Sequence, residues 1–261
     1  MIIEPAIIIF FLLGFIFGSF ANVCIYRIPR DLSVIKPRSA CIGCKKPIAW
    51  YHNIPVFSWV FLRGKCANCG IAISARYPLV ETLMGVLFAL VFARHGWSWI
   101  TLEYLIFVFG LVICTFIDLE FMIIPDIFSL SGIVIGLAGA AINPERSFWE
   151  AVIGILIGGG FLWLIAYLYF LLTKREGLGG GDIKLLGWIG AVLGWKAVPF
   201  VITSSAFVGS MVGIAIMLIR RKDMQTAIPF GPYLALGSVC YVLFAESLAS
   251  SYFSLFLPGL Q

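Results

Sequence analysis

Long apolar runs constrain this chain more than any other feature of its sequence. A transmembrane helix needs about 20 apolar residues. Hydrophobic residues fill 61% of the 261 positions and charged residues only 12%, whereas soluble domains average about 45–50% and about 25%. We therefore expect an all-α polytopic membrane protein. Its expected helices lie near 5–26, 78–94, 99–117, 125–143, 149–173, 197–219 and 228–257.

A shorter apolar run at 183–195 decides the number of spans. Counting it gives about eight helices, and omitting it gives seven and moves the C-terminus to the other side. Lysine and arginine concentrate on the cytoplasmic side of membrane proteins, and the segment 27–77 holds nine of the 18. With eight spans and this segment inside, the basic residues left outside are only Arg94, Arg146 and Lys196. The charge distribution therefore favours eight spans.

The same distribution explains the net charge of +5, so no nucleic-acid partner is needed. We expect three parts: a first transmembrane helix at 1–26, a cytoplasmic cysteine-rich insert at 27–77, and a helical membrane core at 78–261. The first run lacks a basic start, and we interpret it as a retained span rather than a cleaved signal. An insert of about 50 residues is small for an independent domain and often needs a metal or disulfides.

Four of the seven cysteines form two C-x-x-C pairs, Cys41 with Cys44 and Cys66 with Cys69. Paired C-x-x-C turns at such a separation are typical of a structural zinc site, in which four thiolates surround one ion. Disulfides do not suit a reducing cytoplasm, and a redox dithiol would need only one pair. Four protein ligands leave no open position on the metal, so the expected zinc is structural.

Carboxylates inside a membrane are costly and are functional candidates by default. Asp118 and Asp126 lie where the third and fourth runs meet, and Asp182 follows a glycine-rich stretch at 177–181, on the same expected membrane side. Each could instead be a wet interfacial group or a helix N-cap, and Asp126 fits an N-cap best. Four glycines in five positions exceed what a cap requires, and they permit close backbone approach.

Asp118 and Asp182 are expected at similar depth. Two adjacent carboxylates can share a proton, so that one activates water and the other protonates the leaving group. This is the chemistry of aspartic proteases. The chain has two histidines and neither an H-E-x-x-H nor a G-x-S-x-G motif, which argues against metalloprotease and serine hydrolase chemistry.

The glycine-aspartate motif Gly179-Gly180-Gly181-Asp182 is similar to the G-x-G-D motif of intramembrane aspartyl proteases. With further motifs in order, the chain resembles the bacterial type IV prepilin peptidases nearly end to end. These motifs are GSFANVCIYRIP at 18–29, KPRS at 36–39, WYHNIPV at 50–56, LRGKC at 62–66, RYPLVE at 76–81 and PFGPYLALG at 229–237.

The resemblance implies a role for each matching position. Asp118 and Asp182 would be the catalytic aspartates, and Cys41, Cys44, Cys66 and Cys69 the zinc ligands. Gly64 resembles a glycine linked to methylation of the new N-terminus by S-adenosylmethionine. The implied substrates are prepilins or pseudopilins with short basic leaders, cut on the cytoplasmic side of the bacterial inner membrane. Membrane lipid is the other expected partner, and the oligomeric state stays open.

Two other classes of function fit parts of the sequence. A transporter could use Asp118 and Asp182 as a proton or cation relay, but it would predict related half-repeats, which are not evident. A non-catalytic assembly factor could use the zinc module to bind a partner. Cleavage of a pilin by the purified protein separates both from a peptidase.

Overall fold

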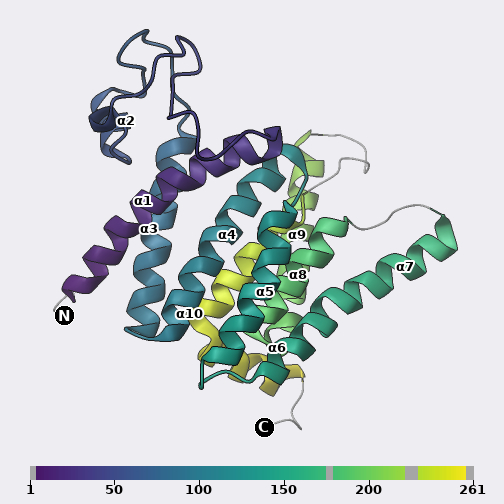
Figure 1. Ribbon diagram of the computed structural model, residues 1–261. Helices are drawn as coiled ribbons and strands as arrows, with labels where there is room; N and C mark the ends of the chain where they lie inside the picture. The colour runs from purple at the N-terminus through teal and green to yellow at the C-terminus, as the bar shows by residue number, and fades with distance from the viewer. Residues whose placement is uncertain (1–3, 175–178, 221–228, 257–261) are drawn as a thin grey trace. The chain divides into compact units, whose positions relative to one another are not determined.

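The computed structural model describes residues 4–174, 179–220 and 229–256 (Figure 1). Gly177 and Leu178 of the glycine-rich stretch lie outside these ranges, as do Arg175, Arg221 and Lys222, which are among the basic residues expected on the cytoplasmic side. Within the described ranges the regular structure is helical, and two isolated β-bridges occur in the cysteine-rich insert. The expected all-α membrane fold is therefore confirmed.

Within the described ranges, every apolar run predicted to be helical is mostly helical. The insert between α1 and α3 has only short helical turns, η1 (Ile28–Arg30), η2 (Trp50–His52) and α2 (Phe57–Phe61). Outside the insert, the elements in chain order are α1 (Pro5–Arg27), α3 (Arg76–His95), α4 (Trp99–Phe121), α5 (Asp126–Ile142), α6 (Phe148–Ile155), the π-turn η3 (Leu156–Gly160), α7 (Phe161–Thr173), α8 (Gly180–Leu193), α9 (Ala197–Arg220) and α10 (Gly231–Phe256).

Five helical segments among the described residues are long and apolar enough to cross a bilayer. Two further apolar helices are shorter, Asp126–Ile142 and Gly231–Phe244. Helix α8 has 14 residues, about 21 Å at 1.5 Å per residue, against a hydrocarbon core of about 30 Å. The expected count of eight spans therefore stays a prediction. The five long segments are Pro5–Arg30, Arg76–His95, Trp99–Phe121, Phe148–Thr173 and Ala197–Ile219.

The chain divides into two compact units. In the first, α1 packs along α3 with the insert between them in sequence. Glycine makes this packing close: a Cβ on Gly14 would lie 2.6 Å from the Cα of Gly85, and one on Gly18 would lie 2.6 Å from the Cα of Glu81. The buried Asn22 side chain donates a hydrogen bond of 3.0 Å to the carbonyl of Tyr77. Small residues at such contacts let membrane helices approach backbone to backbone.

The second unit, which holds most of α4 and all of α5 to α10, is organised around α8. This short helix packs against α5, α6, α9 and α10, and Figure 1 shows it next to α5. Its residues 185–192 are all buried, as expected for a helix that is apolar on every side. At its far end the Arg146 guanidinium donates to the carbonyl of Ala191 at 2.6 Å and pairs with Glu103. The predicted helix at 183–195 is therefore the core of this unit.

Three G-x-x-x-G spacings, at Gly132/Gly136, Gly154/Gly158 and Gly190/Gly194, mark close contacts of the kind that small residues permit between membrane helices. A Cβ on Gly190 would lie 2.1 Å from the carbonyl oxygen of Gly154, and one on Gly158 would lie 2.5 Å from the carbonyl oxygen of Leu186. On the α5 side, a Cβ on Gly132 would meet the indole of Trp188 at 2.3 Å. These glycines let α5, α6 and the π-turn η3 pack closely against α8.

Helix α7 differs from the buried α8, because its apolar side chains are exposed. Nearly every side chain between Phe161 and Leu172 is exposed, although the segment is almost entirely apolar. A soluble protein rarely exposes a continuous apolar surface of this kind. The exposed apolar surface of α7 therefore supports the expected association with a membrane.

Candidate active site and metal centre

Asp118 lies in the last turn of α4, just before the chain reverses. Helix α4 ends at Phe121, and Met122 adopts a positive φ of 56°. The Asp118 side chain is buried, with 5% of its surface exposed. Its Oδ2 accepts a hydrogen bond of 3.0 Å from the backbone N–H of Gly231, the first residue of α10. A helix N-terminus offers free N–H groups and a partial positive charge, both suited to a carboxylate.

Asp182 is the third residue of α8, whose N-cap is Gly179. The interpretation of Asp182 as a possible N-cap is therefore wrong, because the helix begins two residues earlier, at Gly180. Its backbone N–H bonds the carbonyl of Gly179 at 3.1 Å, and its Oδ2 lies 3.3 Å from the position of a Cβ on Gly179. The carboxylate thus curls back over the start of the helix and is half-buried.

Ile124 joins the two aspartate sites. It belongs to the turn between α4 and α5 and is buried. A Cβ on Gly181 would lie 3.0 Å from Ile124 Cβ, and one on Gly231 would lie 3.2 Å from Ile124 Cδ1 and 2.7 Å from Asp118 Oδ2. The starts of α8 and α10 therefore pack on the same turn, and Asp118 is close enough to Asp182 for the two carboxylates to interact electrostatically.

Asp126 has a different environment. It is the first residue of α5, its N-cap is Pro125, and its side chain makes no capping hydrogen bond. The predicted N-cap role is therefore wrong. Instead Asp126 Oδ1 pairs with Lys184 Nζ at 2.7 Å, and the Asp126 side chain is 58% exposed. This ion pair links the start of α5 to the first turns of α8, but exposed pairs contribute little to stability.

Sequence reasoning missed two residues of this site, Gly231 and Ile124. Gly231 stands in the PFGP stretch at 229–232, which was noted only as part of a resemblance. A proline on each side of a Phe-Gly dipeptide signals a chain turn before a helix. Nothing in the sequence could show that the free N–H at this helix start points at Asp118.

The four insert cysteines meet at one point. One sulfur from each of Cys41, Cys44, Cys66 and Cys69 lies within 4.8 Å of the others, as a metal ion would require. The Sγ atoms of Cys41 and Cys69, one from each pair, are 3.7 Å apart. All seven cysteines, which fall in the described ranges, are free thiols. The donor set is four sulfurs, enough to fill the four positions of a tetrahedral ion, which fits a structural zinc site.

Each cysteine pair sits in a turn of the same construction. The N–H of Cys41 bonds the carbonyl of Lys46 at 3.0 Å, and the N–H of Lys45 bonds the carbonyl of Cys41 at 2.9 Å. The second turn repeats this pattern 25 positions later. There Cys66 N–H bonds the Ile71 carbonyl and Gly70 N–H bonds the Cys66 carbonyl, both at 2.9 Å. The insert therefore contains two copies of one cysteine turn, at 41–46 and 66–71, and we call each copy a knuckle. The repeat is not evident from the sequence, because few residues besides the cysteines match.

Backbone N–H groups favour a thiolate in the second knuckle. The N–H groups of Asn68 and Cys69, together with the Cys41 thiol, lower the pKa of Cys66 to about 6. An N–H of Ile71 also favours the thiolate of Cys69, but desolvation and the neighbouring thiols outweigh it and raise the pKa of Cys69 to about 11. Four adjacent thiols cannot all ionise without a cation among them, and a metal ion that displaces their protons supplies that cation.

Gly64 precedes the second knuckle, and its backbone is constrained. It has a φ of +69°, and a Cβ there would lie 2.9 Å from Trp59 Cζ2. The Trp59 indole donates a hydrogen bond of 3.0 Å to the carbonyl of Ile73, while the Ile73 N–H bonds the Gly64 carbonyl at 2.7 Å. Glycine is therefore required here for the local fold.

Comparison with known proteins agrees with this architecture. Residues 12–95 match the bacterial peptidase A24 N-terminal domain, and residues 105–214 match the type IV leader peptidase family. A prepilin leader peptidase/N-methyltransferase of Aeromonas hydrophila is 38% identical, over 95% of this chain and 93% of its own length. The protein of that name from Neisseria gonorrhoeae is 39% identical, over 86% of each chain. No solved structure matches significantly.

The apolar helices and these similarities define a multi-pass peptidase of the inner membrane. The chain belongs to the type IV leader peptidase family. Membership of a peptidase family favours proteolysis over the transporter and assembly-factor alternatives.

Proposed function

We propose that this chain cleaves the leader of prepilins or pseudopilins on the cytoplasmic side, with Asp118 and Asp182 as its acid–base pair. The observation that carries the proposal is the packing of the starts of α8 and α10 on Ile124, which brings Asp182 of α8 close enough to Asp118 at the end of α4 for the two carboxylates to interact. Relatives from three genera are named prepilin leader peptidase/N-methyltransferase, which supports the substrate class.

The geometry suits hydrolysis by a carboxylate pair. Two neighbouring carboxylates resist ionising together and so hold one proton between them. The ionised member takes a proton from water, and the protonated member gives its proton to the departing amine. The Gly231 N–H holds only Oδ2 of Asp118, so Oδ1 stays available for the water or the peptide. A Cβ on Gly179 would lie 3.3 Å from Asp182 Oδ2, so a glycine at this position leaves space beside the carboxylate.

The cysteine cluster serves a structural purpose in this proposal. Cys41, Cys44, Cys66 and Cys69 would hold one zinc ion, which cross-links the two knuckles. The insert needs such a link because few of its apolar side chains are buried, and metal binding can replace a hydrophobic core in a small domain.

The second activity proposed is N-methylation of the new N-terminus with S-adenosylmethionine as methyl donor. The names of the relatives support it. Gly64 is proposed to serve this activity, and its contact with Trp59 indicates that it acts by shaping the second knuckle.

The direct test is to incubate the full-length protein in detergent with a prepilin, with and without S-adenosylmethionine, and to measure product masses. The proposal expects loss of the leader in both samples and a further mass gain of one methyl group only with the donor. An uncut prepilin in both samples contradicts the peptidase assignment.

A further inference from the structure

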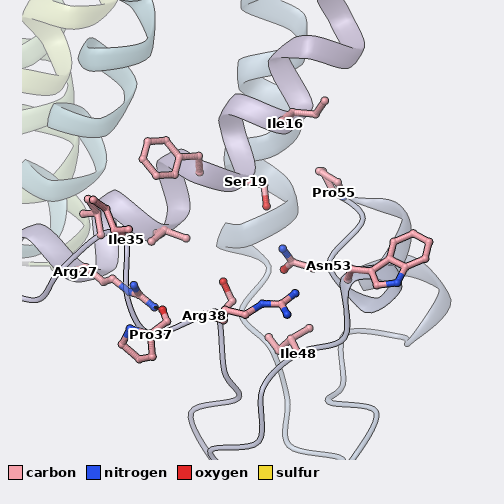
Figure 2. A pocket seen from close by; sticks show the side chains of 14 residues that line it. Ile16, Ser19, Arg27, Ile35, Pro37, Arg38, Ile48, Asn53 and Pro55 are labelled. Carbon is pink, nitrogen blue, oxygen red and sulfur yellow. Dashed lines mark hydrogen bonds between the residues drawn. The ribbon is translucent and has the colours of Figure 1, made fainter.

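A cleft of about 440 Å³ opens within the first unit, beside α1. Its size falls in the range of about 300–1,000 Å³ that small-molecule sites occupy. One wall is apolar and comes from Ile16, Phe20 and Val23 of α1. The others come from two insert segments, 34–39 and 48–55, which Figure 2 shows on either side of the opening. The cleft shares none of the residues of the aspartate site.

Arg38 is the charged group available to a ligand in this cleft. Figure 2 shows its side chain extended between Asn53 and Ile48, and no hydrogen bond or ion pair joins it to another described residue. The second arginine of the lining is already used. Arg27 donates to the carbonyls of Ser33 at 2.8 Å and Pro37 at 2.7 Å, and so holds the loop that carries Arg38. A free guanidinium in a cleft suits a carboxylate, which it can bind with two parallel hydrogen bonds.

On the side of the cleft away from Arg38, the buried carboxylate of Glu81 lies behind the lining residues. The Ser19 hydroxyl bonds Glu81 of α3, whose side chain is 7% exposed and accepts the N–H of Val56 at 2.7 Å. Glu81 thus ties α1, α3 and the insert together directly behind the lining residues Ser19 and Pro55. The cleft therefore has a positive group on one side, a carboxylate beneath the other and an apolar wall between them.

This arrangement matches an amino acid joined to a flat apolar body. The α-carboxylate would face Arg38, and the α-ammonium would face the Ser19–Glu81 side. The lining also includes Trp50, whose ring is 73% exposed and open to stacking with a planar base. We propose that this cleft binds S-adenosylmethionine, with its carboxylate held by Arg38. The proposal rests on the N-methylation proposed above and assigns the donor to residues other than Gly64, which does not line the cleft.

The methyl transfer that this site would serve needs only S-adenosylmethionine and the N-terminal amine as reactants. The lone pair of the uncharged N-terminal amine forms the new N–CH₃ bond. The S–CH₃ bond of the sulfonium breaks, and its electron pair stays on sulfur. The methylated amine then loses one proton to water, which leaves S-adenosylhomocysteine and the N-methylated peptide.

The test compares Arg38→Gln with Arg63→Gln in the full-length protein in lipid nanodiscs. Arg63 is a matched control, because it is an exposed arginine of the same insert outside the cleft. Isothermal titration with S-adenosylmethionine measures the Kd, while prepilin cleavage and zinc content report the fold. We expect Arg38→Gln to raise the Kd about 10- to 100-fold, as for loss of a hydrogen bond between charged groups, and Arg63→Gln to leave it unchanged. Both variants should still cleave prepilin.

A donor analogue without the carboxylate identifies the contact. Decarboxylated S-adenosylmethionine should bind the wild type weakly, and Arg38→Gln should not weaken it further. A second variant, Val34→Trp, fills the cleft without changing its charge and should also raise the Kd for the donor. Both results would support the cleft as the donor site.

Three outcomes overturn the proposal. If Arg38→Gln and Val34→Trp bind the donor as the wild type does, the donor binds elsewhere, and methylation itself stands. If Arg38→Gln raises only the KM for the prepilin, Arg38 binds a carboxylate of the peptide. If the wild type binds no donor, the proposed N-methylation fails together with its site.

Discussion

The backbone N–H of Gly231 donates a hydrogen bond of 3.0 Å to Oδ2 of Asp118. Two residues 113 positions apart in sequence thus connect the end of α4 to the start of α10. The contact explains why Asp118 can be buried in an apolar helix: the free N–H at a helix start replaces part of the water that a carboxylate loses. It also leaves one carboxylate oxygen free for chemistry.

The first prediction concerns this carboxylate and its neighbour. Asp118→Asn and Asp182→Asn keep the shape of the side chain but remove its proton exchange. Each should lower prepilin cleavage by about 10²–10⁴-fold, the usual contribution of an acid or base. Quantitative mass spectrometry of cleaved and uncleaved prepilin measures the loss, with zinc content as the check on folding. Near wild-type cleavage by either variant would show that this aspartate is not catalytic.

Asp126→Asn is the matched control. Asp126 lies eight residues from Asp118, and its exposed side chain pairs with Lys184. Losing an exposed ion pair costs about 0–1 kcal/mol, so cleavage should fall by less than about tenfold. A dead Asp126→Asn beside an active Asp118→Asn would move the catalytic role to Asp126.

The second prediction tests the Gly231 contact. A Cβ at Gly231 would lie 2.7 Å from Asp118 Oδ2, so Gly231→Ala must displace the carboxylate or the start of α10. We expect cleavage to fall about 10- to 100-fold, because small misplacements of catalytic groups are costly. Gly180→Ala is the control, since a Cβ on Gly180 meets nothing within 4 Å. It should cleave close to the wild-type rate in the same assay, and equal losses in both variants would contradict the contact.

The helices and the candidate site residues followed from patterns that act locally. Apolar runs long enough to span a bilayer form helices wherever they occur, and paired C-x-x-C turns bring two sulfurs together by themselves. The cluster at Cys41, Cys44, Cys66 and Cys69 was therefore predictable in its membership. That Asp118 and Asp182 lie near each other was expected from the predicted topology, and the structure has the two carboxylates close enough to interact.

Contacts between distant helix ends were not predictable. Asp126 and Asp182 both follow helix-breaking residues, so each fits an N-cap by local rules. In the structure neither residue is an N-cap. Asp126 pairs with Lys184, and α8 begins at Gly180, so that Asp182 is its third residue. The role of Gly231 depends on the placement of α10 beside α4. No local sequence pattern predicts a contact between two residues so far apart in the chain. The repeated knuckle is likewise defined by backbone hydrogen bonds rather than by side chains.

The third prediction concerns the metal. Purified protein should contain about one zinc ion per chain, held by four thiolates. Cys44→Ser should lower the zinc content and expose the insert to limited proteolysis, because the ion links the two knuckles. Cys114→Ser is the control, since Cys114 is buried in α4 and lies outside the cluster. Stoichiometric disulfides in freshly isolated protein, with no metal, would contradict a zinc site.

The last prediction concerns Gly64 and separates two explanations for a glycine there. Gly64→Val places a branched side chain at a φ of +69° against the Trp59 ring, which lies 2.9 Å from the new Cβ. Strain of this kind costs about 1–3 kcal/mol, and it falls on the second knuckle, far in sequence from Asp118 and Asp182. We expect Gly64→Val to lower methylation more than cleavage, measured as methylated and cleaved product in one reaction.

Trp59→Phe in the same assay shows how Gly64 acts. The smaller ring makes room for a Cβ but loses the hydrogen bond to the carbonyl of Ile73. If packing on Trp59 is the reason for the glycine, the double variant Gly64→Ala, Trp59→Phe should methylate more than the single variant Gly64→Ala. If Gly64 instead touches the methyl donor, Gly64→Ala should raise the Kd for S-adenosylmethionine by the same factor with either residue at position 59. Equal loss of cleavage and methylation in Gly64→Val would mean that the residue supports the fold as a whole.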